Sequence, residues 1–288
     1  MLKIKSMKKL LNISDLNKDD FFSILAYAEE LNNNLDKCLS NKHIGLIFEK
    51  NSTRTRLSFQ VGIKQLNGNY IDIKLDELNL QRLESFEDTF EVMSCYLDCL
   101  VFRTNDHHKL EVAYKFFKKP LINALSDQSH PCQAISDLFT LKEHFGSLNN
   151  IKILWMGDIN NVLFSLAQAM NFLNDSRIDV FTDKKIFEKN FKNYQNFKNI
   201  NFHFKIDESI FRLANCIMTD VFNSMNDKED KEILLKKFQV NKDIMSILPE
   251  SAVFMHCLPA KIGSEVTKEV IKGDRSIVIN QAKNRMIA

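Results

Sequence analysis

Short apolar runs alternate with longer amphipathic stretches through the first half of the chain. Strand-like runs, most of them largely apolar, cover residues 44–48, 69–73, 99–102 and 121–124, and helical patterns cover 53–66 and 87–95. A continuous apolar run of this length is typical of a strand buried on both faces, as in a parallel sheet. The alternation therefore predicts a parallel α/β unit with helices on its faces.

The pattern restarts after one long amphipathic helix, predicted over residues 131–145. Pro131 lies in its first turn, where a missing N–H costs nothing, and Gly146 closes it. Further strands are predicted at 151–156, 178–181, 216–219 and 252–255, with a helix at 161–173. We therefore predict two α/β domains, each a parallel sheet flanked by helices. Their expected bounds are 1–130, a connecting helix at 131–146, and 147–288 with a shortened C-terminal segment.

Composition agrees with this division. The length of 288 residues is close to the size at which chains split into two domains. Hydrophobic residues make up 44% and charged residues 26%, which is typical of a globular protein. Because 39 basic residues nearly balance 37 acidic ones, charge offers no support for nucleic acid as a partner.

Cysteine usage and hydropathy indicate which cellular compartment to expect for this protein. The six cysteines include no C-x-x-C pair, so neither a zinc ribbon nor a thioredoxin motif is expected, and we predict no metal site. No signal-peptide pattern is visible, and no apolar run approaches the ~20 residues that span a membrane. We expect a cytoplasmic protein with free thiols and no membrane partner.

The candidate ligand residues are those that follow the strands, because ligands of open α/β sheets bind beyond the carboxyl ends of strands. After the first strand, Ser52-Thr53-Arg54-Thr55-Arg56 opens a helix. Its hydroxyl groups are expected to cap that helix, while outward N–H groups and guanidinium groups suit a phosphate-like ligand. On spacing alone, a plain cap with solvated arginines fits equally well.

Polar residues follow other strands too. Arg103 ends one strand, and His130 stands at the mouth of the helix from residue 131, where a neutral imidazole would donate to a carbonyl oxygen. Asn161 follows the Gly157 turn, which lacks the G-x-G-x-x-G fingerprint of a dinucleotide site, and is a candidate for polar substrate groups. Taken singly, each position also fits an ordinary structural role.

The last two strand ends carry Asp220 and Cys257. Asp220 suits a substrate ammonium or an ordinary helix N-terminus, and Cys257 suits a nucleophile, a hydrogen-bonding thiol or a buried thiol. Together, the polar clusters at strand ends favour an active site for a phosphate-type ligand and an amino-acid-like partner. Spacing leaves carbamoyl, phosphoryl and hydride transfer open.

Four segments resemble motifs of the aspartate/ornithine carbamoyltransferase family. Residues 48–56 (FEKNSTRTR) resemble its carbamoyl-phosphate signature, and residues 130–133 (HPCQ) resemble its second carbamoyl-phosphate motif. Asp220 with Ser224-Met225, and residues 256–260 (HCLPA), resemble motifs of the ornithine branch. The motifs follow in order from about residue 5 to residue 288, and they are specific in combination.

The resemblance implies carbamoyl transfer from carbamoyl phosphate to the δ-amine of L-ornithine, with no cofactor, as in arginine biosynthesis. It implies that the carbamoyl-phosphate site comprises Ser52, Thr53, Arg54, Thr55, Asn79, Arg103, His130, Gln133, Cys257, Leu258 and Arg285. It implies that the ornithine site comprises Asn161, Asp220, Ser224 and Met225, and that the catalytic residues are Arg54, Arg103, His130 and Cys257. Cys257 is then expected to orient the amine with Asp220 rather than to act as a nucleophile. A homotrimer, or a multiple of trimers, with sites at subunit interfaces is also implied.

Three positions depart from the family pattern. Asn79 takes the place of a glutamine that a neighbouring subunit contributes, and Asn226 follows Met225 where glycine is usual. Asparagine tolerates positive φ better than most residues, so that turn is expected to survive. Three residues follow Arg285, where the family continues into a further helix.

Three alternatives stay open at this stage. One is a carbamoyltransferase for another amine, such as putrescine or an N-acylated ornithine, although Asp220 with Ser224-Met225 favours free ornithine. The second is a dehydrogenase built on the Gly157 turn, and the missing fingerprint counts against it. The third is a paralogue without activity. Every carbamoyl-phosphate position except Asn79 matches the family pattern, which disfavours this alternative.

Overall fold

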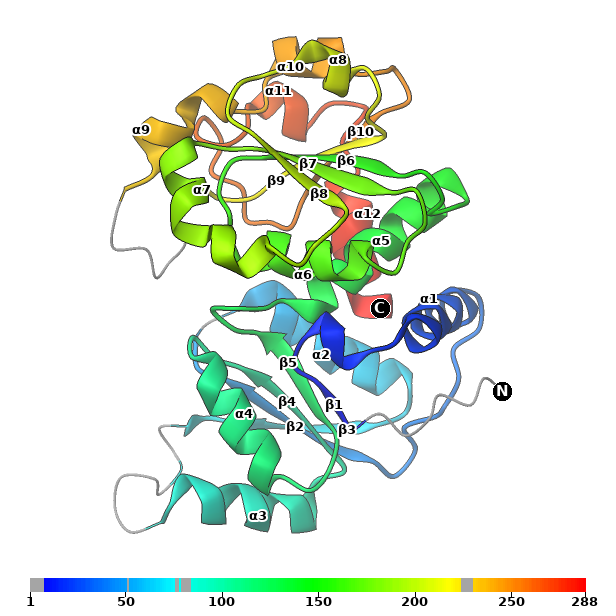
Figure 1. Ribbon diagram of the computed structural model, residues 1–288. Coiled ribbons are helices and arrows are strands. Elements are labelled where there is room, and N and C mark those ends of the chain that lie inside the picture. Colours follow the sequence, from blue (N-terminus) through cyan, green and yellow to red (C-terminus); the bar gives the residue numbers. More distant parts are fainter. Residues whose placement is uncertain (1–7, 51, 76–77, 79–83, 224–229) are drawn as a thin grey trace. The chain divides into compact units, whose positions relative to one another are not determined.

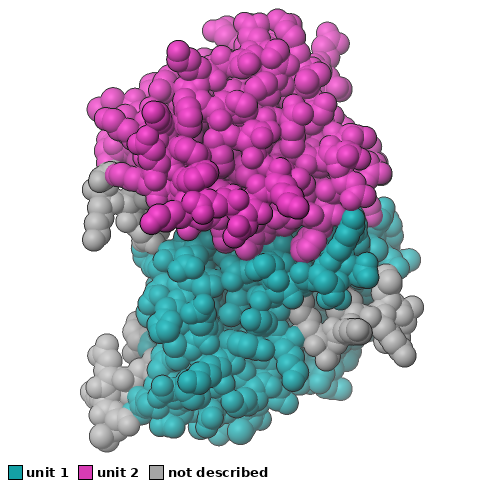
Figure 2. All heavy atoms as spheres, in the orientation of Figure 1, with its two compact units in different colours: residues 1–139, 284–288 teal, residues 140–283 magenta. Residues whose placement is uncertain are grey.

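Two parallel five-stranded sheets organise the chain in the computed structural model, which describes residues 8–50, 52–75, 78, 84–223 and 230–288 (Figure 1). The chain divides into two compact units, residues 1–139 with 284–288 and residues 140–283 (Figure 2). Each unit contains one sheet, and every strand pair in both sheets is parallel. The predicted fold class, two parallel sheets flanked by helices, is therefore confirmed.

The first sheet has the strand order β1-β5-β4-β2-β3. Its strands are β1 (Lys9–Leu10), β2 (His43–Phe48), β3 (Asn69–Ile73), β4 (Cys99–Arg103) and β5 (Leu121–Leu125). The helices of this half are α1 (Lys18–Asn33), α2 (Thr53–Gln65), α3 (Phe86–Tyr96), α4 (His107–Phe116) and α5 (Pro131–Phe145), with a 3₁₀ helix η1 (Ile13–Asp15). The predicted bounds of β2 to β5, α2, α3 and α5 are correct within one residue, whereas β1, α1 and α4 were not predicted.

The second sheet has the strand order β10-β9-β6-β7-β8. Its strands are β6 (Lys152–Met156), β7 (Arg177–Phe181), β8 (Ile200–His203), β9 (Cys216–Thr219) and β10 (Val253–His256). The helices are α6 (Asn161–Met170), α7 (Lys184–Asn190), α8 (Glu208–Phe211), α9 (Glu232–Leu235), α10 (Lys242–Ile247), α11 (Lys268–Ile271) and α12 (Val278–Ile287), with 3₁₀ helices η4 (Phe191–Tyr194) and η5 (Lys236–Phe238). Helix α6 ends three residues before its predicted end.

Strand register brings the segments after several strands to one edge of each sheet. In the first sheet Phe48 pairs with Arg103, so the segment after β2 begins beside the end of β4. In the second, Met156 pairs with Thr219, and Thr219 pairs with His256. The residues directly after β6, β9 and β10 therefore lie at the same carboxyl edge, where open α/β sheets bind ligands.

Two glycines are required by the turns that they occupy. Gly146 has φ +75°, and its N–H donates to the Lys142 carbonyl over 2.8 Å, which closes α5 as predicted. Gly157, directly after β6, has φ +119°, and a Cβ there would lie 2.7 Å from Cε1 of Phe222. Both the backbone conformation and the space exclude a side chain at Gly157.

The length and hydropathy of the helices decide whether any of them could cross a membrane. Within the part of the chain that the structure describes, every helix is too short or too polar to cross a bilayer.

Candidate active site

The first turn of α2 lies directly beyond β2. Ser52 is the N-cap residue, Thr53 and Arg54 are exposed, and Thr55 is buried. The prediction that the Ser52 hydroxyl caps this helix is wrong, because that hydroxyl makes no capping bond. It accepts instead from Nη1 of Arg103 over 3.0 Å. The first N–H groups of α2 therefore keep their capacity to donate to an anion.

Two guanidinium groups converge on the hydroxyl of Thr55. Arg103, at the end of β4, donates to it from Nη1 over 3.1 Å, and Arg285, in α12, donates from Nη2 over 2.8 Å. Thr55 is only 2% exposed, so both charges are drawn toward a buried point beside a helix N-terminus. Two positive charges held this close repel each other, and an anionic ligand would offset that repulsion.

Arg285 also contacts the start of α5. It donates from Nη1 to Oε1 of Gln133 over 2.6 Å, and from Nη2 to Nε2 of His130 over 2.7 Å. Because a guanidinium only donates, Nε2 of His130 accepts, and the ring proton lies on Nδ1. Burial, with Arg285 and Arg103 nearby, holds the pKa of His130 well below its ordinary value. His130 is therefore neutral at pH 7.

A buried network holds the loop that precedes His130. Nδ2 of Asn123 donates to the Ser129 carbonyl over 3.2 Å, and the Ser129 N–H donates to Oγ of Ser126 over 3.1 Å. Nδ1 of His107 lies 2.7 Å from the same Oγ. The sequence pattern did not single out these residues. Their signal is one asparagine inside the apolar strand β5, where a buried amide needs partners.

Glu49, directly after β2, is the nearest acidic residue to the Ser52 turn along the chain. Its carboxylate pairs with Nζ of Lys109 over 2.6 Å and accepts from the Thr104 hydroxyl. Because Lys109 offsets the negative charge of Glu49, this carboxylate does not cancel the positive charge of the arginines at the start of α2.

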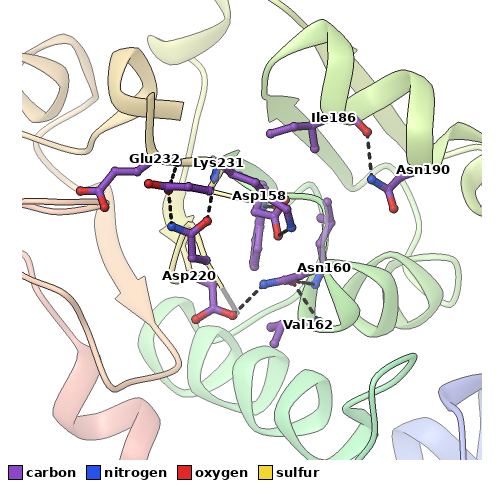
Figure 3. A network of polar contacts seen from close by, with 12 residues as sticks. Asp158, Asn160, Val162, Ile186, Asn190, Asp220, Lys231 and Glu232 are labelled. Carbon is purple, nitrogen blue, oxygen red and sulfur yellow. Dashed lines mark hydrogen bonds and ion pairs between the residues drawn. The ribbon is translucent and has the colours of Figure 1, made fainter. Parts of the chain in front are cut away.

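The second unit gathers a different set of groups at the ends of its strands. Asp220 follows β9 and is 8% exposed. Its Oδ2 accepts from Nδ2 of Asn160 over 2.7 Å, and its Oδ1 accepts from Sγ of Cys257 over 3.1 Å (Figure 3 labels Asn160 and Asp220). The structure therefore brings Asp220 and Cys257 together, and it adds Asn160, which the sequence pattern did not single out.

The turn after β10 is held from two sides. Leu258 has φ +54°, and its N–H donates to Nδ1 of His256 over 2.9 Å. The His256 ring therefore carries its proton on Nε2, which lies 3.2 Å from Oε1 of Glu265. The same carboxylate oxygen accepts from the Lys261 N–H over 2.5 Å. These bonds fix the backbone around Cys257.

Of the remaining predicted ornithine residues, the structure describes Asn161. Asn161 is the first residue of α6 and is partly buried. Asn223 and Asp230 are joined by a hydrogen bond of 2.7 Å. Lys231 pairs with Asp158 over 2.9 Å, and Figure 3 labels both of these residues. Four positions named from the sequence lie outside the described residues: Asn79, Ser224, Met225 and Asn226.

One group of potential metal ligands occurs within the described ranges of the chain. Single ligand atoms of Asp220, His256 and Cys257 all lie within 4.8 Å of one another. Both ring nitrogens of His256 and both oxygens of Asp220 already take part in hydrogen bonds. An ion bound there would have to replace several of these bonds.

Comparison with known proteins identifies the family. The aspartate/ornithine carbamoyltransferase carbamoyl-P binding domain matches residues 8–143, and the Asp/Orn binding domain of the same family matches residues 149–288. The chain belongs to the aspartate/ornithine carbamoyltransferase family. The part that matches the carbamoyl-P binding domain contains Thr55, Arg103 and His130, and the part that matches the Asp/Orn binding domain contains Asp220 and Cys257.

Individual members of the family resemble the chain over nearly its whole length. The ornithine carbamoyltransferase of Methanosphaera stadtmanae is 37% identical over 98% of this chain and 96% of its own. The structure of ornithine carbamoyltransferase from Pyrococcus furiosus matches with a TM-score of 0.86 and 33% identity, covering 98% of this chain and 94% of that one. An anabolic ornithine carbamoyltransferase from Campylobacter jejuni matches with a TM-score of 0.84 and 32% identity, covering 98% and 96%.

Proposed function

We propose that this protein is an ornithine carbamoyltransferase. It transfers the carbamoyl group of carbamoyl phosphate to the δ-amine of L-ornithine and gives L-citrulline and phosphate. The observation that carries the proposal is the convergence of Arg103 and Arg285 on Thr55, beside the open N-terminus of α2. The relatives named ornithine carbamoyltransferase support ornithine as the acceptor.

The α2 end suits the phosphate of carbamoyl phosphate. N–H groups and hydroxyls of its first turn donate to phosphate oxygens, and guanidinium groups match two oxygens at once. We assign the phosphate to Ser52, Thr53, Arg54 and Thr55. We assign the carbonyl and amide ends to Arg103, His130, Gln133 and Arg285, which are linked by hydrogen bonds to each other or to Thr55. Asn79 is expected to contribute from a neighbouring subunit.

Transfer then needs no cofactor. The neutral δ-amine attacks the carbonyl carbon, a C–N bond forms, and the C–O bond to phosphate breaks as the amine loses a proton. Negative charge grows on the carbonyl oxygen in the tetrahedral intermediate. Arg54, Arg103 and the neutral His130 stabilise this charge, as in an oxyanion hole.

The second unit supplies the groups for the amino acid. Asp220 and Cys257, which are joined by a hydrogen bond, orient the amine, and Leu258 lines the reacting centre. Asn161, Ser224 and Met225 hold the α-amino and α-carboxylate groups. We propose residues 1–130 as the carbamoyl-phosphate-binding domain, 131–146 as the connecting helix, and 147–288 as the ornithine-binding domain, whose last residues, 284–288, belong to the first compact unit.

We infer a homotrimer, or a multiple of trimers, in the cytoplasm. An apolar face on α2 and the edge strand β3 supports assembly, since Leu57, Val61 and Ile71 are 51%, 41% and 43% exposed. The six cysteines form no disulfide, which fits a reducing compartment. The anabolic relative from Campylobacter jejuni supports a place in arginine biosynthesis.

The test is a panel of amines offered with carbamoyl phosphate. The protein is incubated with L-ornithine, putrescine or N-acetylornithine, and carbamoylated product and phosphate are both measured. Citrulline and phosphate in equal amounts are expected with L-ornithine. A product with putrescine or N-acetylornithine alone would change the acceptor, and no product with any amine would overturn carbamoyl transfer.

A further inference from the structure

We propose that Asn160 is a positioning residue for the amine-binding carboxylate of Asp220. This inference rests on the proposed function and adds a residue to it. Asn160 lies between β6 and α6, at the carboxyl edge of the second sheet. None of the motifs that carry the family resemblance includes it.

The first step is the capping of α6. Oδ1 of Asn160 accepts from the N–H groups of Val162 and Leu163, both over 3.1 Å. These two bonds fix the orientation of the side-chain amide, because only the oxygen of an amide accepts. The NH₂ group must then face the other way.

The second step is what that NH₂ group meets. Nδ2 of Asn160 donates to Oδ2 of Asp220 over 2.7 Å (Figure 3). Cys257 donates to the other oxygen, so donors from two turns hold the two oxygens of one carboxylate. A carboxylate can accept along about four lone-pair directions. Because two hydrogen bonds fix the orientation of the Asp220 carboxylate, its other lone pairs point in fixed directions.

The third step is the consequence for the reaction. Asp220 binds an amine productively only if its oxygens point at the nitrogen that attacks, and misplacement by about 1 Å costs rate steeply. Asn160 combines two tasks that few side chains combine, since it accepts at a helix N-terminus and donates to a carboxylate. Aspartate would keep the cap but has no hydrogen to donate, and serine would keep the cap with its one hydroxyl but has no NH₂ group to reach Asp220.

The experiment separates these two tasks. Asn160→Ser keeps the cap and removes the donor, Asn160→Asp keeps the cap and places a carboxylate against Asp220, and Asn160→Ala removes both. The matched controls are Asn241→Ser and Asn241→Asp, because Asn241 caps α10 by accepting from the Ile244 N–H over 3.0 Å. Asn241 makes no contact with Asp220 in the described part of the chain.

We expect the Asn160→Ser variant to lose about 10- to 100-fold in kcat/KM for ornithine, the range for one hydrogen bond to a charged group. Asn160→Asp loses more, because two carboxylates repel each other at this distance. The dissociation constant for carbamoyl phosphate, measured by calorimetry, stays at the wild-type value in every variant. Thermal unfolding of Asn160→Ser and both Asn241 variants stays near wild type, whereas Asn160→Ala, which loses the cap, and Asn160→Asp, which gains the repulsion, unfold earlier.

The results that overturn the proposal are distinct from those that overturn the function. Wild-type kcat/KM for ornithine in Asn160→Ser would show that Asn160 only caps α6. An equal loss of carbamoyl-phosphate affinity would indicate general distortion instead of positioning. If the wild-type protein itself makes no citrulline, the proposed function fails first, and the role of Asn160 fails with it.

Discussion

The turns from β2 to α2 and from β6 to α6 look alike in outline and differ in chemistry. Each leads from a buried strand into a helix at the carboxyl edge of its sheet. At α6 the N-cap side chain of Asn160 accepts two backbone N–H groups. At α2 the N-cap residue Ser52 accepts none, and its hydroxyl accepts from Arg103 instead.

The difference indicates which helix end is available to an anion. A capped N-terminus has already used its N–H groups, so phosphate finds fewer donors there. An uncapped one beside two guanidinium groups offers N–H groups, hydroxyls and charge together. The contrast also weakens the dinucleotide alternative, because the turn that Gly157 opens leads to the capped helix.

The largest expected effect comes from replacing the Arg103 guanidinium beside the uncapped helix α2. Arg103→Lys keeps a positive charge, but an ammonium does not reproduce the fork that reaches Ser52 and Thr55. We expect kcat/KM for citrulline formation to fall about 10²- to 10³-fold, as for loss of one oxyanion donor. The matched control is Arg212→Lys, directly after α8, which should act like wild type because that side chain is 65% exposed. A fall of less than tenfold would contradict the role.

The second prediction concerns the glycine that opens the capped turn. Gly157→Ala meets both a positive φ and the ring of Phe222 at 2.7 Å, so the free energy of unfolding should fall by about 2–4 kcal/mol. Gly146→Ala has a positive φ but nothing within 4 Å, so it should cost about 1 kcal/mol. Urea unfolding of both variants measures the difference. Equal costs would mean that Phe222 moves aside.

The third prediction sharpens the contrast between the two N-cap residues. Ser52→Ala should change the free energy of unfolding by less than about 0.5 kcal/mol, because the hydroxyl caps nothing. Asn160→Ala should cost about 1 kcal/mol, the usual effect of losing a cap. Ser52→Ala should nevertheless lower kcat/KM about tenfold, through loss of the Arg103 contact. Denaturation and citrulline assays on the same two variants check both parts.

The smallest expected effect comes from His130. Its pKa is lowered in the folded protein by burial, Arg285 and Arg103, while an unfolded histidine titrates near 6.5. Below that pH the unfolded chain takes up a proton that the folded one refuses, so stability falls by at most about 1.4 kcal/mol per pH unit. Above it, the effect vanishes.

His130→Asn should therefore lose less stability than wild type between pH 7.5 and 5.5, measured by urea unfolding. His108→Asn is the matched control, since it removes an imidazole whose side chain is 76% exposed. Identical pH dependence in wild type and His130→Asn would refute the assignment of this loss to His130.

The strands of the fold were predictable because most of them are buried on both faces. Strands such as β6 and β9 appear as short, largely apolar runs, and in an α/β chain a run of that length is typical of a central parallel strand. Strand β1 has two residues, and the edge strand β8 is only partly buried, so neither shows this pattern. Gly146 was predictable as a helix end because glycine adopts positive φ at low cost.

The site was less predictable, because its contacts join distant parts of the chain. The hydroxyl of Ser52 matches the capping pattern, and only Arg103, 51 residues later, explains why it does not cap. Asn160 also matches that pattern, and its bond to Asp220, 60 residues later, adds a role that the pattern does not contain. Strand ends located Arg103, His130, Asp220 and Cys257, but Arg285 was named only through the family resemblance.

Helix α12 has a consequence for the order in which a ribosome makes this protein. Residues 284–288 belong to the first unit, and Arg285 contacts Thr55, which precedes it by 230 residues. Early domains often fold while later residues are still being synthesised. The nascent first unit would therefore carry Arg103 but lack Arg285 until residues 140–283 of the second unit have been synthesised. The proposed carbamoyl-phosphate site would therefore be completed only after the ribosome has made the whole second unit.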